Sequence, residues 1–446
     1  MTETADNTPD ISLEEVIAAA LARARERGAE QAEAAVSLGT GLSVNLRQGE
    51  VETLEHQRDR GFSITVYVNG RKGSVSSSDL TAAAVRDMVD KACSIARFTA
   101  EDPCSGLADA DRMATDFPDL DLDHPWPVSA EEAIEIARAC EAAGMAEDAR
   151  ITNSEGASVS THRSERLYGN SHGFLGGSAA SSHSVSCVLI ASDDKGMQRD
   201  YWYSWARNPE DLGDLEAVGR RAGQRAVSRL GAAKIDTCTA PVLFAAEVAR
   251  GLLGHFVGAV KGGSQYRKSS FLLDAAGQQI FPDWMQFQER PHIRRGAASA
   301  SFDREGVATT DRDLVADGVL TGYVLSSYSA RRLGLETTAN AGGIQNLLVS
   351  HGDEDLDGLM KTMDRGLLVT ELMGQGVNPV TGDYSRGASG YWVENGEIVR
   401  PVEEVTIAGN LRDMYAGIRA VGSDVDVRGA IQTGSILLSP LTIAGS

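Results

Sequence analysis

The spacing of hydrophobic residues changes several times along the chain, and each spacing predicts one kind of element. Near the N-terminus, Ser12 and Glu15 have the spacing of a capping box, and Ile11 and Val16 have that of a hydrophobic staple. Apolar residues then recur with helical spacing until a glycine is reached. We therefore expect a helix over about residues 13–27.

Alternation of apolar and polar residues follows this helix. It covers residues 42–46 and 62–68, and the second run ends at Asn69-Gly70, a pair typical of a tight hairpin turn. Helical spacing returns over about residues 82–97. The next segment, 101–127, is acidic, contains prolines and has neither period, which indicates a connector.

The order of elements then repeats. Ser129 and Glu132 predict a second capping box and a helix to about residue 143. Strand-like segments follow through residues 185–190, with a hairpin near 193–196 and a helix near 215–230. This repeated order suggests duplication of one helix-and-strand unit.

The last third of the chain is rich in turn signals. A short buried strand is expected at residues 241–244, running into a helix from about residue 246. Asp317-Gly318 and Asn395-Gly396 separate apolar runs as hairpin turns do. Further helices are predicted over two ranges, 356–365 and 411–421.

These elements predict an α+β protein with antiparallel and mixed sheets and flanking helices. At 446 residues the chain exceeds what one hydrophobic core usually organises. We expect an N-terminal α/β domain (1–100), an acidic connector (101–128), a central α+β domain (129–236) and a β-rich C-terminal domain (237–446).

Composition narrows the class of protein. The sequence has no apolar run long enough to cross a bilayer, and its first ten residues lack the features of a secretion signal. Five scattered cysteines, none in a C-x-x-C arrangement, predict free thiols and a cytoplasmic location. The formal net charge of −21, without a basic stripe, argues against direct binding to nucleic acid, and we expect no membrane association.

Two short patterns suggest chemistry of their own. Residues 169–173 fit G-x-S-x-G around Ser171, but a nucleophile elbow requires a helix directly after the serine, and a glycine-rich segment follows here. His162, His172 and His183 recur in a strand-rich region, without the cysteine or carboxylate spacing that would support a metal site. In these sequence contexts, the first pattern is weak evidence for a catalytic serine and the second is weak evidence for a metal site.

Several longer phrases, in a fixed order, resemble the TldD/PmbA (modulator of gyrase) family. They include Tyr266-Arg267-Lys268-Ser269, the segments 370–376 and 381–387, and Ile407-Ala408-Gly409-Asn410, with earlier matches at 61–78 and 102–104. The resemblance covers essentially the whole chain, and the matching motifs resemble those of the TldE/PmbA branch.

The resemblance implies where a metal site would lie. The TldD branch carries an H-E-x-x-x-H helix whose histidines bind zinc, with a C-terminal cysteine as third ligand. Placed on this sequence, those positions are Gly254, His255 and Ala259 on the helix and Thr433 near the C-terminus. Glycine and alanine carry no donor atoms, and a neutral hydroxyl is a poor ligand for zinc. We therefore expect no metal, no cofactor and no catalytic residue in this chain.

Apolar residues at helical spacing indicate that the helix is a core element. Gly258 would permit a local distortion of this helix. Charged and aromatic residues of the matching phrases are candidates for a peptide-binding cleft, or for ordinary surface ion pairs. They are Tyr266, Arg267, Lys268, Asp383 and Arg386.

The resemblance implies a role as one subunit of a zinc metallopeptidase that acts on peptides and on unfolded or small proteins. In this hypothesis a TldD-like catalytic subunit is the partner and supplies the zinc, and this chain completes the cleft. The alternatives are an independently active hydrolase with an unrecognised site and a non-proteolytic binding or scaffold protein. A homodimer is expected when the partner is absent.

Overall fold

One long strand, β1 (Gln31–Arg47), runs through two hydrophobic cores of the computed structural model, which describes residues 12–445. Its first half contributes Ala34 and Val36 to one core, and its second half contributes Val44 and Leu46 to another. All four residues have even numbers and lie on one face of the sheet, because side chains alternate along a strand. The helices that cover these cores therefore lie on the same face.

The N-terminal and central segments share a single sheet. Its order is β3-β2-β1-β4-β5-β6, and every pairing is antiparallel. The other strands are β2 (Glu50–Val68), β3 (Arg71–Ser77), β4 (Ile151–Asn170), β5 (Leu175–Asp193) and β6 (Gly196–Ala206). The segments 1–100 and 129–236 are thus joined through the β1–β4 pairing.

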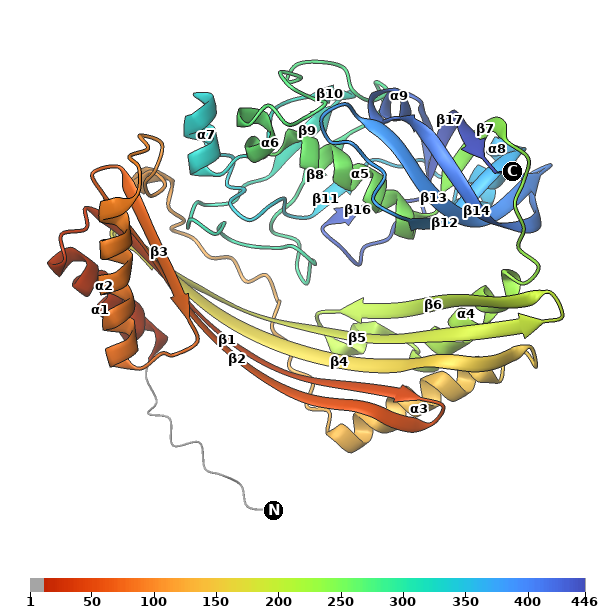
Figure 1. The fold of residues 1–446 in the computed structure, drawn as a ribbon, viewed down its shortest axis with the longest axis horizontal. Helices are drawn as coiled ribbons and strands as arrows, with labels where there is room; N and C mark the ends of the chain where they lie inside the picture. The colour runs from red at the N-terminus through yellow and green to blue at the C-terminus, as the bar shows by residue number, and fades with distance from the viewer. Residues whose placement is uncertain (1–11, 446) are drawn as a thin grey trace.

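Two pairs of helices cover this sheet, one pair at each end (Figure 1). The pair α1 (Leu13–Glu26) and α2 (Ala82–Phe98) packs on the first core. The pair α3 (Ala130–Met145) and α4 (Leu215–Ser228) packs on the second. The repeated order of elements in the sequence corresponds to these two units on one sheet.

The C-terminal segment forms two further sheets. One has the order β14-β13-β12-β7-β17-β15, and a pairing between β14 and β17 closes it on itself. Its strands are β7 (Cys238–Phe244), β12 (Gly366–Met373), β13 (Asp383–Glu394), β14 (Glu397–Asn410), β15 (Ile418–Val421) and β17 (Ile436–Ala444).

The second C-terminal sheet is smaller, with the order β10-β9-β8-β11-β16. Its strands are β8 (Phe287–Glu289), β9 (Arg312–Ala316), β10 (Val319–Leu320), β11 (Leu347–Val349) and β16 (Ile431–Gln432). The accompanying helices are α5 (Ala246–Val260), α6 (Gly262–Tyr266), α7 (Ser327–Leu333), α8 (Leu356–Met363) and α9 (Leu411–Ala416). Helix α5 lies in the largest core, which contains residues of both sheets.

The predicted α+β class, with antiparallel and mixed sheets and flanking helices, is confirmed. Most predicted helices are present within a few residues of their expected ends, and the second capping box forms at Ser129. The first does not, because the Ser12 hydroxyl donates to the Glu14 carboxylate instead. Ile11 of the predicted staple lies outside the described residues.

The helix predicted over residues 411–421 is wrong in its second half. Helix α9 ends at Ala416, and residues 418–421 form β15, which pairs with β17. Gly417 marks the change, and the strand pairing prevails over the helical spacing.

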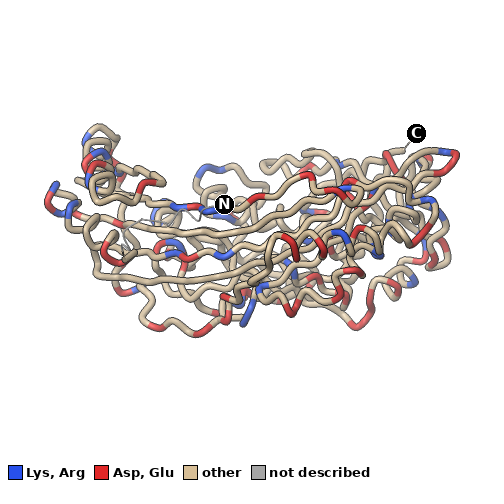
Figure 2. The backbone as a smooth tube through the Cα atoms, turned by 90° about the horizontal axis from the view of Figure 1, so that it is seen from below, with Lys and Arg blue, Asp and Glu red and all other residues tan. Residues whose placement is uncertain are grey.

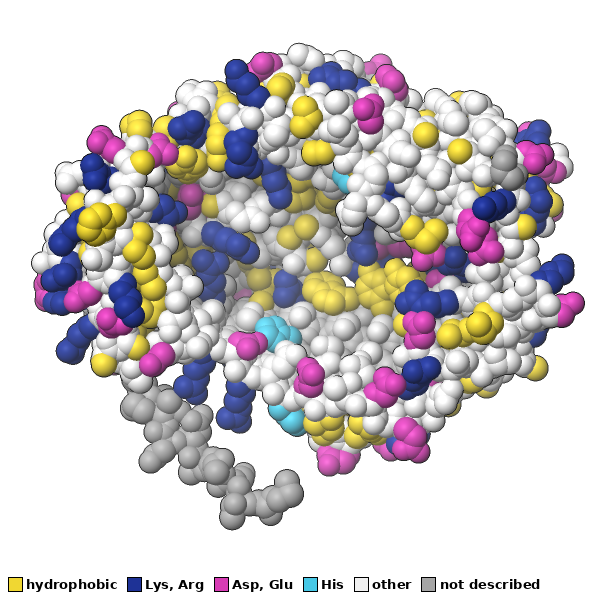
Figure 3. Space-filling view, in the orientation of Figure 1, with side chains coloured by type: hydrophobic (Ala, Val, Ile, Leu, Met, Phe, Trp, Pro, Cys, Tyr) yellow, Lys and Arg dark blue, Asp and Glu magenta, His cyan; other side chains and the backbone are white. Residues whose placement is uncertain are grey.

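Charge is spread over the whole molecule. Asp and Glu occur along the full length of the chain, with Lys and Arg between them (Figure 2). The space-filling view shows a hollow between the N-terminal sheet and the C-terminal segment, and Lys and Arg side chains gather in it (Figure 3). Within residues 12–445, every helix is too short or too polar to span a lipid bilayer.

Candidate functional site

Helix α5 is the element on which the sequence analysis placed the altered metal positions. It starts directly after the buried strand β7 and is an uninterrupted α-helix from Ala246 to Val260. The distortion that Gly258 would permit is absent. On such a helix, positions 254 and 259 point about 140° apart.

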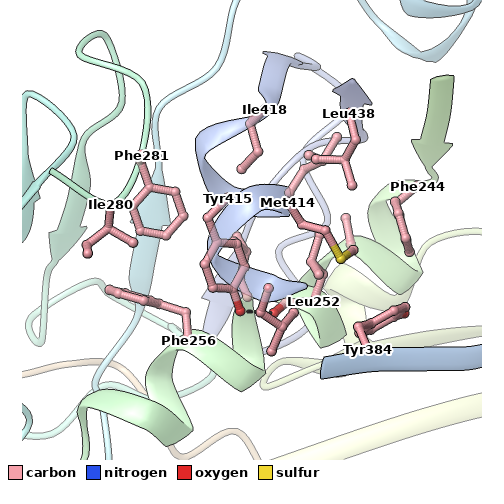
Figure 4. Close-up of a cluster of buried hydrophobic side chains, with 14 of the residues drawn as sticks. Phe244, Leu252, Phe256, Ile280, Phe281, Tyr384, Met414, Tyr415, Ile418 and Leu438 are labelled. Carbon is pink, nitrogen blue, oxygen red and sulfur yellow. Dashed lines mark hydrogen bonds between the residues drawn. The ribbon is translucent and has the colours of Figure 1, made fainter. Parts of the chain in front are cut away.

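Aromatic packing fixes α5 from the side of the core (Figure 4). Phe256 is completely buried and meets Phe281, Phe287 and Tyr415 edge to face. The Tyr415 hydroxyl donates to the Leu252 carbonyl at 3.0 Å, so that the one polar atom of this ring is satisfied. This face of α5 therefore serves stability, and any ligand must approach another face.

A pocket of about 380 Å³ lies over the other face of α5. Gly254, His255 and Ala259 all line it, so the structure brings three of the four expected positions together. Thr433 is not among its lining residues. That residue is completely buried, and its hydroxyl donates to the Gly434 carbonyl at 3.1 Å.

Two glycines of α5 leave the floor of this pocket without side chains. A Cβ atom at Gly254 or Gly258 would meet no heavy atom within 4 Å beyond the local helix backbone. The opposite walls come from the loop after α6, from the segment after β12, from β13 and from the start of α9. Their apolar members are Phe271, Val377, Pro379 and Leu411.

Two basic side chains, His255 and Arg386, line the pocket. His255 is half-buried, and both this burial and the nearby Arg386 guanidinium lower the pKa of its imidazole. Arg386 has no hydrogen-bond acceptor or ion-pair partner among residues 12–445, and its Nε is buried. The hydroxyl of Tyr384, two residues earlier on β13, is also buried without a partner. Burial raises the pKa of Tyr384 to about 12, so this hydroxyl keeps its proton.

The donors of this pocket do not form a metal-binding set. Gly254 and Ala259 offer none, and His255 is the one imidazole among the lining residues. Across the described part of the chain, no three His, Cys, Asp or Glu side chains gather in an arrangement suited to a metal ion. Zinc sites in proteins use three or four such ligands.

The five residues predicted to form a cleft do not come together. Arg386 lines the pocket, whereas the Tyr266 ring has the guanidinium groups of Arg267 and Arg332 near it, with Cζ-to-centroid distances of 5.2 and 5.5 Å. Lys268 is exposed next to them and has a positive φ of 56°. Asp383 accepts from the Thr381 hydroxyl at 2.6 Å and from Asn410. These contacts explain Asp383 as a structural residue of a turn.

The two weaker sequence patterns serve structure. Ser171 lies in the turn between two antiparallel strands, and its hydroxyl accepts from the Ala32 amide at 3.0 Å. No helix follows it, which excludes a nucleophile elbow. His183 is 1% exposed, and its ring nitrogens bond to the Thr161 hydroxyl and the His124 carbonyl, both at 2.8 Å.

A buried ion network that was not predicted from the sequence joins the two halves of the molecule. Asp200 of β6, 3% exposed, accepts from Arg225 at 3.1 Å and lies 3.5 Å from Arg229. Arg225 also donates to Glu247 in the first turn of α5 at 2.8 Å. Arg229 reaches Glu371 of β12 at 2.6 Å. These partners are far apart in sequence, so no local motif marks them.

A larger pocket of about 860 Å³ opens beside this network. Two of its arginines, Arg225 and Arg428, are already paired with carboxylates. Arg221 and Arg400 also line it, and Arg221 lies over the Trp202 ring. Arg386, in contrast, has no such carboxylate partner in the pocket over α5.

Comparison with protein families covers nearly the whole chain. Three models match in order: PmbA/TldA metallopeptidase domain 1 at residues 32–96, the central domain at 123–230 and the C-terminal domain at 237–445.

Individual proteins match over the same length. The metalloprotease PmbA of Escherichia coli O157:H7 is 51% identical over 97% of this chain and 96% of its own. A solved structure from Bacteroides thetaiotaomicron, described as a putative modulator of DNA gyrase, has a TM-score of 0.92 at 27% identity, over 97% of this chain and 99% of that one. TldE from Thermococcus kodakarensis shares the fold, with a TM-score of 0.82 at 18% identity, over 96% of this chain and 100% of that one.

Proposed function

Because the chain belongs to the PmbA/TldD metallopeptidase family, we propose that it is the TldE/PmbA-like subunit of a two-subunit zinc metallopeptidase. In this proposal a TldD-like partner supplies the zinc and the catalytic residues. This chain completes the cleft in which peptides or unfolded proteins are held, and it works in the cytoplasm.

The donor set of the pocket over α5 carries the proposal. At the positions where the resemblance places two histidines and a cysteine stand a glycine, an alanine and a buried threonine. A zinc ion needs imidazole, thiolate or carboxylate ligands in tetrahedral arrangement, and one imidazole does not hold it. Arg386 also places a positive charge in the same pocket, which opposes a divalent cation.

The retained architecture supports a role beside a catalytic subunit. Helix α5 follows β7 directly, and aromatic rings pack against its buried face. The pocket above it is open, and Gly254 and Gly258 keep it so. A subunit of this form can bind part of a substrate without cleaving it.

A mixing experiment tests this function. Cleavage of an unfolded protein such as casein is measured for this chain alone, for a TldD-like subunit alone and for the two together, each with and without a chelator. The proposal predicts no cleavage by this chain alone and greater, chelator-sensitive cleavage by the mixture than by the partner alone.

Two other results would contradict it. Chelator-resistant cleavage by the isolated chain would indicate an independent hydrolase. Failure of the two chains to associate in analytical ultracentrifugation, with no gain in activity, would indicate a non-proteolytic binding protein.

A further inference from the structure

The charge of Arg386 is not neutralised within the described structure. Its Nε is buried without an acceptor. No carboxylate among residues 12–445 forms an ion pair with it, although the chain has 63 acidic residues. A half-buried charge of this kind is costly unless an ion of opposite charge joins it.

The neighbours of Arg386 favour a hydrogen-bond acceptor. The Tyr384 hydroxyl is buried without a partner two residues away on the same face of β13, although Tyr384 does not itself line the pocket. The His255 imidazole lines the same pocket and can donate a hydrogen bond. A carboxylate is the group in peptides that accepts several such bonds, and arginine binds it with two parallel N–H groups.

The rest of the pocket is small and largely made of apolar residues and glycines, with Ser264 and Gln375 as its other polar members. Phe271, Val377, Pro379 and Leu411 form its walls, and the bare backbone of Gly254 and Gly258 forms its floor. Its volume of about 380 Å³ is near the lower end of the range for ligand pockets. It has room for one residue and its carboxylate, and little room for a chain that passes through.

We propose that this pocket binds the C-terminal carboxylate of a peptide whose last side chain is apolar. Arg386 pairs with the carboxylate, and the apolar side chain lies against the glycine floor of α5. The inference rests on the proposed function and names the part of the substrate that this subunit holds. In the catalytic branch the corresponding site binds a cation, whereas in this chain it would bind an anion.

The hollow shown in Figure 3 suits this assignment. Arg166 and Arg304 line a second pocket, between β4 and the C-terminal segment. Burial and the nearby charge of Arg304 lower the pKa of Arg166. A protein of net charge −21 thus keeps cationic groups in this hollow. Such groups attract carboxylates locally, because surface charges elsewhere are screened within about 8–10 Å.

The test is a binding measurement on the isolated chain, so that it does not depend on a partner or on cleavage. Isothermal titration with N-acetyl-Ala-Leu as the free acid should give saturable binding with one site per chain. The same peptide as its C-terminal amide should bind at least about tenfold more weakly, because it lacks the charge. N-acetyl-Asp-Leu-amide carries a side-chain carboxylate but no C-terminal one, and it should also bind weakly. This peptide therefore distinguishes a C-terminal carboxylate from a side-chain carboxylate as the bound group.

Substitution of Arg386 identifies the site. Arg386→Gln should weaken binding of the free acid at least about tenfold and make the acid and the amide bind equally. Arg386→Lys should retain part of the preference for the acid, because it keeps the positive charge. The matched control is Arg365→Gln, since Arg365 is an exposed arginine just before β12 that packs over Trp392. It should bind like the unmodified chain.

Three results would overturn the proposal: no binding of the free acid, equal binding of acid and amide, or binding by Asp-Leu-amide as strong as that of the free acid. Unchanged binding by a folded Arg386→Gln variant would also overturn it. If that variant does not fold, Gly258→Leu replaces it, because its side chain would fill the pocket from the open floor and should abolish binding. Loss of acid binding in this test leaves the mixing experiment unaffected, so the two proposals fail separately.

Discussion

The ring of His255 meets the ring of Tyr384 edge to face, with the ring centroids 6.3 Å apart and the planes at 79°. The first comes from α5 and the second from β13, so this contact joins the helix to the sheet at the border of the pocket. Tyr384 is 2% exposed and cannot move aside. His255 is thereby held next to Arg386, in surroundings that disfavour a second positive charge.

This contact predicts an acid-sensitive step in stability. The pKa of His255 is lowered in the folded state by burial and by Arg386, so the unfolded chain binds the proton first as the pH falls below about 6.5. His255 therefore contributes a loss of stability below that pH and none well above it. His255→Gln should lose less stability than the unmodified chain between pH 7.5 and pH 5.5, in urea unfolding.

His351→Gln is the control for this prediction, because His351 is an exposed histidine. It should leave the pH dependence unchanged. Identical slopes for His255→Gln and the unmodified chain would contradict the account of the pocket's electrostatics.

The glycines of α5 predict a conflict between stability and binding. Gly258 and Gly251 both lie inside the helix, and neither position would bring a Cβ atom within 4 Å of a neighbour. Replacing either with alanine should raise the free energy of unfolding by about 0.5–1 kcal/mol, because alanine restricts the unfolded chain.

Only one of these substitutions should affect the pocket. Gly258 lines it and Gly251 does not, so Gly258→Ala should weaken binding of the acid peptide while Gly251→Ala leaves it intact. Urea unfolding and titration calorimetry measure the two effects. A lower free energy of unfolding for Gly251→Ala would contradict the finding that a Cβ atom at this position meets no neighbour.

The buried ion network predicts a large effect far from the pocket. Asp200→Asn removes the carboxylate between Arg225 and Arg229 and leaves buried positive charge with fewer partners. The free energy of unfolding should fall by roughly 3–5 kcal/mol. Asp194→Asn, at an exposed turn, is the control and should change it by less than about 0.5 kcal/mol. Equal effects of the two substitutions would contradict the assigned role of the network.

Local signals in the sequence were sufficient for most elements. Helix starts at Ser129 and the hairpin turn at Asn69-Gly70 depend on neighbouring residues, and both are present as predicted. The sharing of one sheet by β1 and β4, and the closure of another by β14 and β17, depend on pairing between distant segments. No local period carries that information. For the same reason the second half of the helix predicted at 411–421 became β15.

The site shows the same division. Helical spacing correctly indicated which face of α5 is buried, and three altered metal positions do line one pocket. Thr433 lies outside that lining, and of the five cleft candidates Arg386 alone belongs to it. The lack of a partner for Arg386 is a property of three-dimensional surroundings, which sequence does not express. Asp200 and its arginines were missed because each looks like an ordinary surface charge.

The most direct test of the central claim is the zinc content of the isolated chain. The purified protein is dialysed against buffer with micromolar zinc, freed of unbound metal and measured by inductively coupled plasma mass spectrometry. The account predicts far less than one zinc ion per chain, with no change on substituting His255. One zinc ion per chain, lost in a His255→Ala variant, would contradict it.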